Sequence, residues 1–182
     1  MSDRDATDAE ATDAVTGNTT AGPGAILKRL VEEAVSADLV ALHGPVTLVE
    51  RGDDPSPAAR VLDQVGGGES IVGVVPRIEP SLARGLAGSV DSEVRLVLTG
   101  SAGERLTGTS GAPARAVLAN HGIEAYIHDG DSPVGVLLVG NHALVGLFDD
   151  DGLAAVLSSD SPLVREWVTA TCQRYFAAAD QV

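Results

Sequence analysis

The stretch HDGDSPVGVLLVGNHALVGLFDDDG, residues 128–152, holds two of the chain's four histidines and five of its sixteen aspartates. Two apolar runs, 134–139 and 143–148, lie between its acidic ends, and a Gly-Asn-His turn at 140–142 separates them. Apolar runs bounded by glycine, asparagine and aspartate are typical of strands joined by tight turns, because these residues tolerate a positive φ. The stretch therefore predicts a β-hairpin, and it raises the question of whether its histidines and aspartates also form a chemical site.

Strands and helices are expected to alternate along the chain before this hairpin. Residues 70–76, SIVGVVP, are almost continuously apolar and β-branched, which is typical of a strand buried on both faces. The other elements expected from the apolar spacing are strands at 45–50, 93–100 and 123–128, and helices within 53–68 and at 79–88, 101–106 and 112–122. This order predicts an α/β sandwich with a mainly parallel sheet, to which the hairpin adds an antiparallel part.

The end of the chain predicts a long helix that closes the domain. Ser161 and Pro162 are a common N-cap and first helical residue. They precede an apolar stripe of Val164, Trp167, Val168, Thr171, Cys172 and Tyr175. Trp167, the only tryptophan, is either a core anchor or a wall on which a ligand stacks, and its place on the stripe favours the core. Cys172, the only cysteine, excludes an internal disulfide and a cysteine-built zinc site, and is expected to be a small buried side chain.

The length of 182 residues suits one domain and a tail. Residues 1–24 are polar, acidic and low in complexity, which predicts a disordered tail. Residues 25–182 are expected to form one effector or sensor domain that begins with an amphipathic helix over 25–42. Because the chain lacks both an apolar signal segment and an apolar run approaching ~20 residues, we expect a cytoplasmic protein without a membrane span.

The chain is strongly acidic, with 26 acidic against 12 basic residues and a net charge of −14. Eleven of the basic residues are arginines, and aromatic residues are few. This composition is similar to that of haloarchaeal cytoplasmic proteins, whose carboxylates keep the surface hydrated in concentrated salt. The alternative is an acidic mesophilic protein from a GC-rich genome. In either case the arginines are scattered, so we expect no direct binding of nucleic acid, which needs basic patches.

Four enzyme signatures are missing from the sequence. A phosphate-binding P-loop needs Gly-Lys-Ser/Thr, but the only lysine, Lys28, falls in an expected helix. The segment GGGESIVG, residues 66–73, precedes its strand and lacks the spacing of a dinucleotide loop. The chain contains no Gly-x-Ser-x-Gly elbow, and no lysine follows a histidine as phospholipase D-type catalysis requires. We therefore expect no enzymatic activity and no cofactor.

The remaining polar candidates are His121, His128, Asp129, Asp131, Asn141, His142 and Asp149–Asp151. A metal site needs ligands one helical turn apart or on neighbouring strands. His128 and His142 could therefore share a metal only if strands 123–128 and 134–139 pair in a suitable register. The DDDG segment lacks the alternating acidic positions of a calcium loop. Turn chemistry explains most of these acids, so a metal site is not expected.

The last sixty residues also resemble a known family. IEAYIHDGDSPVGVLLVGNHALVGLFDDDGLAAVLSSDSPLVREWVTATCQRYFAAA, residues 123–179, runs through strands, an acidic turn, a Ser/Asp-Pro cap and a helix with REW and RYF. This pattern is similar to the effector domain of archaeal methanogenesis-regulatory-protein-type transcription regulators. The segment IVGVVPRIEPSLARGLAGSVDSEVRLVLTG, residues 71–100, resembles that family's strand, proline, helix and next strand. The resemblance covers about residues 58–180.

The resemblance implies a phospholipase D-like α/β fold that lacks the catalytic His-Lys pair and senses a small molecule or an intracellular state. Such regulators carry a winged-helix DNA-binding domain before the effector domain. Residues 25–50 are too few for a winged helix, so the chain is expected to be an effector domain without its own DNA reader. Val134 stands where the family carries an aromatic residue, which puts a pocket built on that aromatic in doubt.

Three functions follow as hypotheses. The first is a non-enzymatic regulatory domain, homodimeric or paired with a related regulator, that senses an unknown small molecule. Its ligand contacts would be His128, Asp129, Asn141 and Trp167. The pocket would lie at the strand ends near the 128–133 turn and Asn141, where α/β sheets bind ligands. The second is a small hydrolase that uses the His/Asp cluster. The third is a pure dimerisation module that associates through the closing helix, 162–178.

Overall fold

The computed structural model describes residues 21–88 and 92–182. Of the tail expected over residues 1–24, the first twenty residues lie outside the described part, and Pro23 and Gly24 already belong to the first helix. The strands are β1 (Val46–Glu50), β2 (Ile71–Val75), β3 (Val94–Leu98), β4 (Ile123–Ile127), β5 (Gly135–Val139), β6 (His142–Asp149), β7 (Gly152–Ser159) and β8 (Asp180–Gln181). The helices are α1 (Pro23–Val35), α2 (Pro57–Val65), α3 (Pro80–Ala87), α4 (Gly100–Glu104), α5 (Ala112–Asn120) and α6 (Pro162–Phe176), with short 3-10 turns η1 (Leu39–Ala41) and η2 (Thr109–Gly111).

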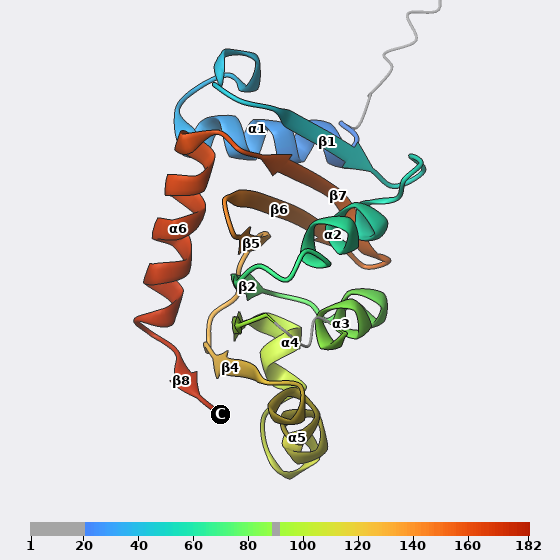
Figure 1. The fold of residues 1–182 in the computed structure, drawn as a ribbon, viewed down its shortest axis with the longest axis vertical. Coiled ribbons are helices and arrows are strands. Elements are labelled where there is room, and N and C mark those ends of the chain that lie inside the picture. Colours follow the sequence, from blue (N-terminus) through green and yellow to red (C-terminus); the bar gives the residue numbers. More distant parts are fainter. Residues whose placement is uncertain (1–20, 89–91) are drawn as a thin grey trace, which may run out of the picture.

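All the described strands form one sheet, in the order β1-β7-β6-β5-β2-β3-β4-β8 (Figure 1). The expectation of a mainly parallel sheet is wrong. Only β2–β3 and β3–β4 are parallel, whereas the other five pairs in the described part are antiparallel. The expected α/β class and the antiparallel hairpin, which is β5 and β6, are confirmed.

The path of the chain after β4 explains the mixed sheet. Helices connect β2 to β3 and β3 to β4, so these strands run in the same direction. Residues 128–134 then cross to β2 without a helix, and β5 begins at the edge of the sheet where β2 ends. A strand that starts at that edge has to run antiparallel to β2. The first strand, β1, pairs with β7 near the other end of the sequence.

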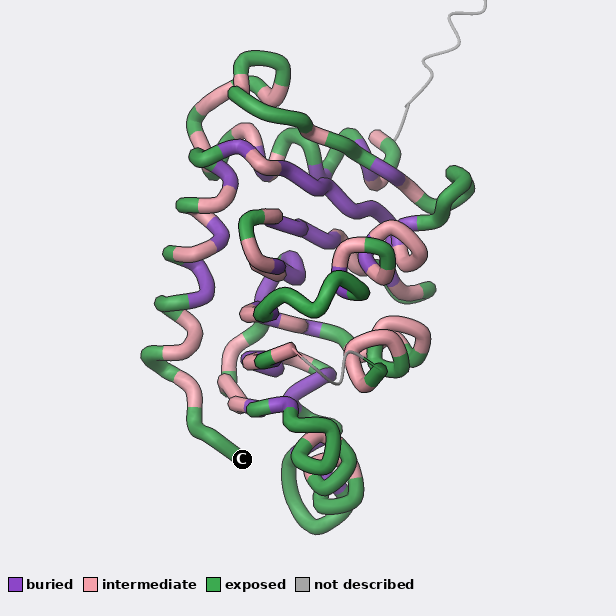
Figure 2. Tube along the Cα trace, viewed as in Figure 1, coloured by how far each residue is buried: buried purple, intermediate pink, exposed green. Residues whose placement is uncertain are grey.

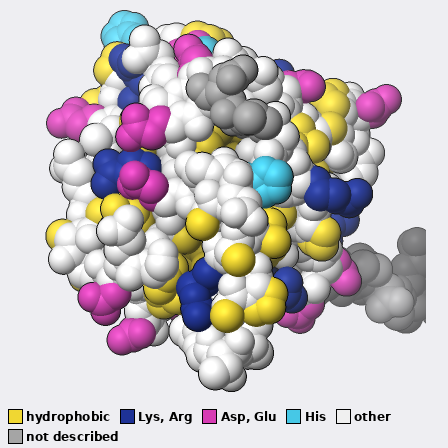
Figure 3. Space-filling view, turned by 60° about the horizontal axis from the view of Figure 1, so that its bottom comes forward, with side chains coloured by type: hydrophobic (Ala, Val, Ile, Leu, Met, Phe, Trp, Pro, Cys, Tyr) yellow, Lys and Arg dark blue, Asp and Glu magenta, His cyan; other side chains and the backbone are white. Residues whose placement is uncertain are grey.

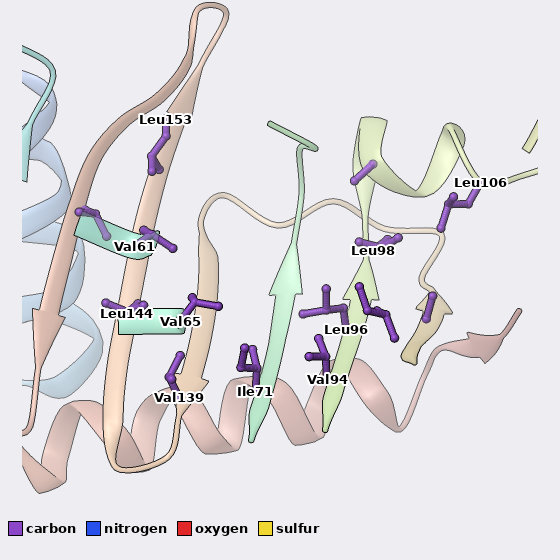
Figure 4. Packing of buried hydrophobic residues seen from close by; sticks show 14 of the residues in the cluster. Val61, Val65, Ile71, Val94, Leu96, Leu98, Leu106, Val139, Leu144 and Leu153 are labelled. Atoms are coloured by element: carbon purple, nitrogen blue, oxygen red, sulfur yellow. The ribbon is translucent and has the colours of Figure 1, made fainter. Parts of the chain in front are cut away.

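Helices cover both faces of the sheet, and each face has its own apolar core. α1 and α6 pack on one face, around buried side chains such as Leu27, Val136 and Val168. α2, α3 and α5 pack on the other face, around Val61, Leu96, Leu144 and further buried residues (Figure 4). Burial is concentrated in the strands between the two helical layers (Figure 2). The fold is therefore a three-layer α/β/α sandwich.

The first and last helices differ in detail from the sequence expectation. The helix expected over 25–42 ends at Val35, because Ser36 adopts a left-handed conformation with φ of 53° and bonds back to the carbonyls of Glu32 and Glu33. Ser161 is the N-cap residue of α6 as expected, but its hydroxyl makes no capping bond. None of the helices in residues 21–88 and 92–182 is long and apolar enough to cross a membrane.

Candidate functional site

The turn after β4 lies at the carboxyl edge of the parallel strands. It lines an open polar cleft together with Pro76 and Arg77, which follow β2, and with Gly100 and Ser101, which follow β3. Asp129 is exposed in this cleft. This is the edge at which α/β sheets commonly bind ligands, so the structure places one part of the expected site in a suitable position.

His128 is held by its neighbours rather than directed freely into the cleft. Its Nδ1 accepts a hydrogen bond of 2.9 Å from the Gly130 N–H. Its ring contacts the Tyr175 ring of α6 edge-on, with the ring centroids 4.9 Å apart. The Tyr175 hydroxyl donates a hydrogen bond of 3.1 Å to the Asp131 carbonyl. These contacts fasten the turn to α6.

Asn141 and Asp129 lie at opposite ends of the strands, on opposite edges of the sheet. β5 separates the 128–133 turn from Asn141, and its five residues span roughly 14 Å from first to last Cα. The Asn141 side-chain oxygen accepts a hydrogen bond of 3.2 Å from Arg165 of α6, and the neighbouring His142 pairs with Asp160. The expected pocket between the 128–133 turn and Asn141 is therefore not formed. β4 also pairs with β3 and β8 instead of β5, so His128 and His142 do not come together.

Trp167 and Cys172, both on α6, belong to the apolar core between this helix and the sheet. Trp167 is half-buried and packs against the apolar cluster beneath α1 and α6, and it lines neither the cleft nor the cavity described below. Cys172 is buried as expected. Burial raises the pKa of its thiol to about 11, so the thiol remains protonated at neutral pH and is a poor nucleophile.

The acidic turn between β6 and β7 is tied to two arginines. Arg51, just after β1, donates two hydrogen bonds of 2.8 and 2.7 Å to the Asp149 carboxylate. This pairing holds the pKa of Asp149 below its ordinary value. Arg77 donates a hydrogen bond of 2.7 Å to the Asp149 carbonyl and lies 3.5 Å from the Asp150 carboxylate. In the described part of the chain, no three His, Cys, Asp or Glu side chains are grouped so that they could hold a metal ion.

An apolar cavity lies on the opposite face of the sheet from α6. It has a volume of about 160 Å³, lies between α2, α3, α5 and the central strands, and is partly open to solvent. Its walls include Val61, Leu86, Leu96, Ala125 and Leu144, most of which Figure 4 shows together on this face. On the side of the molecule that carries α5, hydrophobic side chains gather toward the middle and acidic ones lie mostly around them (Figure 3). The apolar spacing of the sequence did not predict this cavity.

Two glycines in paired strands line the cavity and leave room for neighbouring side chains. Gly135 of β5 and Gly146 of β6 lie directly opposite each other and both line it. The Phe148 ring lies close to both glycines, next to a β-bulge between Leu147 and Phe148. Phe148 and Arg77 line the polar cleft as well, so the two hollows adjoin. Glycines in strands that otherwise carry large apolar side chains were the signal in the sequence for this close packing.

Solved structures of low sequence identity share this fold. The phospholipase D family member Nuc from Salmonella typhimurium has a TM-score of 0.61 and 19% identity, with 77% of this chain and 99% of that chain covered. NucT from Helicobacter pylori has a TM-score of 0.58 and 10% identity, with 76% and 99% covered. TrmBL2, an archaeal chromatin protein with a novel mode of DNA binding, has a TM-score of 0.57 and 13% identity, with 85% and 61% covered. The chain therefore has a phospholipase D-like α/β fold.

The sequence itself identifies the family. The family model for the middle domain of the methanogenesis regulatory protein FilR1 matches residues 55–178, and the chain belongs to this family. This confirms the regulator family expected from the motifs in 71–100 and 123–179. No curated protein sequence matches the chain.

Proposed function

We propose that this protein is a non-enzymatic regulatory domain that senses a small molecule bound in the apolar cavity beneath α2, α3 and α5. Membership of a regulator family supports a regulatory role. The cavity is the observation that carries the ligand site, because ligand pockets in proteins are concave, largely apolar and few per protein. Asp129 in the adjoining cleft is proposed as an outer contact, whereas Asn141 and Trp167 line neither the cavity nor the cleft.

A regulatory role without catalysis rests on the missing nucleophile. The phospholipase D-type reaction needs a His-x-Lys pair. Lys28 is the only lysine of the chain, and it lies in α1, on the face of the sheet opposite the cavity. The likeness to a phospholipase D family member is the one observation that favours the hydrolase alternative. A phosphodiester substrate such as bis(p-nitrophenyl) phosphate tests it. We expect no turnover above that of buffer, and turnover that disappears in His128→Ala would support the hydrolase instead.

The ligand-sensing role is tested by filling the cavity. Ala125 is a buried residue of β4 that lines it, so Ala125→Leu should occupy part of the space. Ala119 of α5 is exposed and does not line the cavity, and Ala119→Leu therefore adds the same atoms elsewhere. A thermal-shift screen of chemically varied small molecules should find compounds that stabilise the wild type and Ala119→Leu but not Ala125→Leu. If no compound of any class does so, the cavity is not a sensing site.

We further propose that the domain acts as a homodimer or together with a related regulator. Leu163 of α6 is 47% exposed, which offers apolar surface on the helix that the dimer hypothesis invokes. Light scattering of the intact chain and of Leu163→Glu tests this arrangement. A dimer in the wild type and a monomer in the variant are expected, and a monomer in both would contradict it.

A further inference from the structure

We propose that the cavity ligand is a small, uncharged and apolar molecule, about the size of a single six-membered ring. This inference rests on the proposed function and specifies the chemical class that the same site accepts. Three features of the cavity carry it: its volume, the composition of its walls and the protein partners of Glu79 and Arg77 at its rim.

The volume sets the size of the ligand. The cavity measures about 160 Å³. An apolar cavity of about 150 Å³ lined by Leu, Ile and Phe stays dry and binds benzene, whereas drug-sized ligands need roughly 300–1,000 Å³. The space is therefore suited to one ring or to a short branched hydrocarbon chain.

The carboxylate at the rim of the cavity already has partners within the protein. Among the described lining residues, the ionisable side chains are those of Arg77, Glu79 and His121. One carboxylate oxygen of Glu79 accepts the Ser81 hydroxyl at 2.7 Å, and the other accepts the Leu153 N–H at 3.2 Å. Both carboxylate oxygens of Glu79 are thus engaged with the protein itself.

The other two ionisable side chains at the rim are those of Arg77 and His121. The Arg77 guanidinium bonds to the Asp149 carbonyl and lies beside the Asp150 carboxylate, so it is committed to the acidic turn. His121 is the exposed C-cap residue of α5, so its ring is in contact with solvent and is not part of the buried apolar walls. A charged group placed among Leu86, Leu96 and Leu144 would lose its hydration and find no partner in return, which is strongly unfavourable. The walls thus select for apolar molecules and against ions of either sign.

Three probes of the same shape and different charge test the inference: toluene, benzylamine and benzoate. Their binding to the full chain is measured by ligand-observed NMR, together with the shift in thermal unfolding. We expect toluene to bind the wild type and Ala119→Leu with equal affinity, and to bind Ala125→Leu at least about tenfold more weakly. Benzylamine and benzoate should each bind the wild type at least about tenfold more weakly than toluene.

A second variant protects the test against misfolding. If Ala125→Leu loses its native circular dichroism, Ala87→Leu replaces it, since Ala87 lines the cavity from α3 and is only half-buried. Charged probes that bind as well as toluene and are lost in the filled variants would overturn the inference while supporting the proposed function. If neither toluene nor the charged probes bind the wild type, both the ligand class and the cavity as a sensing site fail. Toluene binding that is unchanged in the filled variants would also overturn the inference.

Discussion

Gly73 lies in the middle of β2, directly opposite Leu137 of β5. A Cβ atom at this position would be 2.5 Å from the carbonyl oxygen of Val136, which belongs to the same sheet and has no room to move. Gly73→Ala should therefore lower the free energy of unfolding by about 1–3 kcal/mol, as is usual for an overpacked interior. Urea denaturation followed by circular dichroism measures the change.

Gly67→Ala is the matched control for this substitution. A Cβ atom at Gly67 would have no neighbour closer than the carbonyl oxygen of Gln64, at 4.0 Å. The control should unfold within about 0.5 kcal/mol of the wild type, as surface substitutions usually do. Equal unfolding midpoints for the two variants would contradict the close approach of β2 and β5.

Single residues were predictable from sequence where a periodic pattern constrained them. The apolar stripe of the last helix correctly predicted that Cys172 is buried, and it favoured the core position that Trp167 partly occupies. The position of His128 could not be predicted from such a pattern. Its position depends on Tyr175, which lies 47 residues further along the chain and approaches only after α6 has packed on the sheet. Local spacing carries no information about such a contact.

At the level of elements, the acidic turn between β6 and β7 is held to the end of β1 by Arg51 and Asp149. Because the folded chain lowers the pKa of Asp149, this pair contributes stability above the ordinary pKa of an aspartate. That contribution is lost as the pH falls through the lowered pKa of the folded state. Arg51→Gln should therefore shift acid unfolding to higher pH, measured by circular dichroism at low ionic strength.

Arg105→Gln is the control for the loss of a positive charge. Arg105 is exposed, and neither an ion pair nor a side-chain hydrogen bond is found for it within residues 21–88 and 92–182. It should shift the acid midpoint less than Arg51→Gln does. Since both side chains of the Arg51–Asp149 pair are well exposed, high salt should reduce the difference between the two variants. A difference that persists unchanged in high salt would speak against an ion pair as its cause.

The elements themselves were predictable more reliably than their order in the sheet. Apolar runs and Pro or Gly ends identified β1 to β6 and the six α-helices of the described part. Most ends differ by a few residues, whereas the first helix ends at Val35 instead of residue 42. The direction and neighbours of the strands depend on how the chain crosses the sheet, and the loop 128–134 carries no helix that would have signalled its path. β8 has only two residues, too few for any periodic pattern.

At the scale of the whole molecule, the 26 acidic residues repel one another, and within residues 21–88 and 92–182 only a few of them are paired with arginines. Raising the salt from about 0.1 M to about 1 M shortens the screening length from roughly 10 Å to 3 Å. Because repulsion destabilises the compact state, the thermal midpoint should rise over this range in sodium chloride. Differential scanning calorimetry measures it, and the haloarchaeal source expected from the composition stays a prediction.

Sucrose at matched osmolality separates charge screening from the general effect of a crowded solvent. It leaves the repulsion between carboxylates in place, so it should raise the midpoint less than salt does. An equal rise in both solutions would mean that the net charge of −14 does not limit the stability of the fold.

The edge strand β1 determines where the chain can be truncated without exposing a strand of the sheet. The family model begins at residue 55, after both α1 and β1, yet β1 pairs with β7 along five residues. A fragment of residues 55–182 would expose the backbone N–H and C=O groups of β7, and an uncovered strand of this kind readily pairs with another chain. We expect this fragment to elute from a sizing column as larger species than residues 21–182. The family model spans the region of sequence similarity, whereas the folded domain also includes α1 and β1, which precede residue 55.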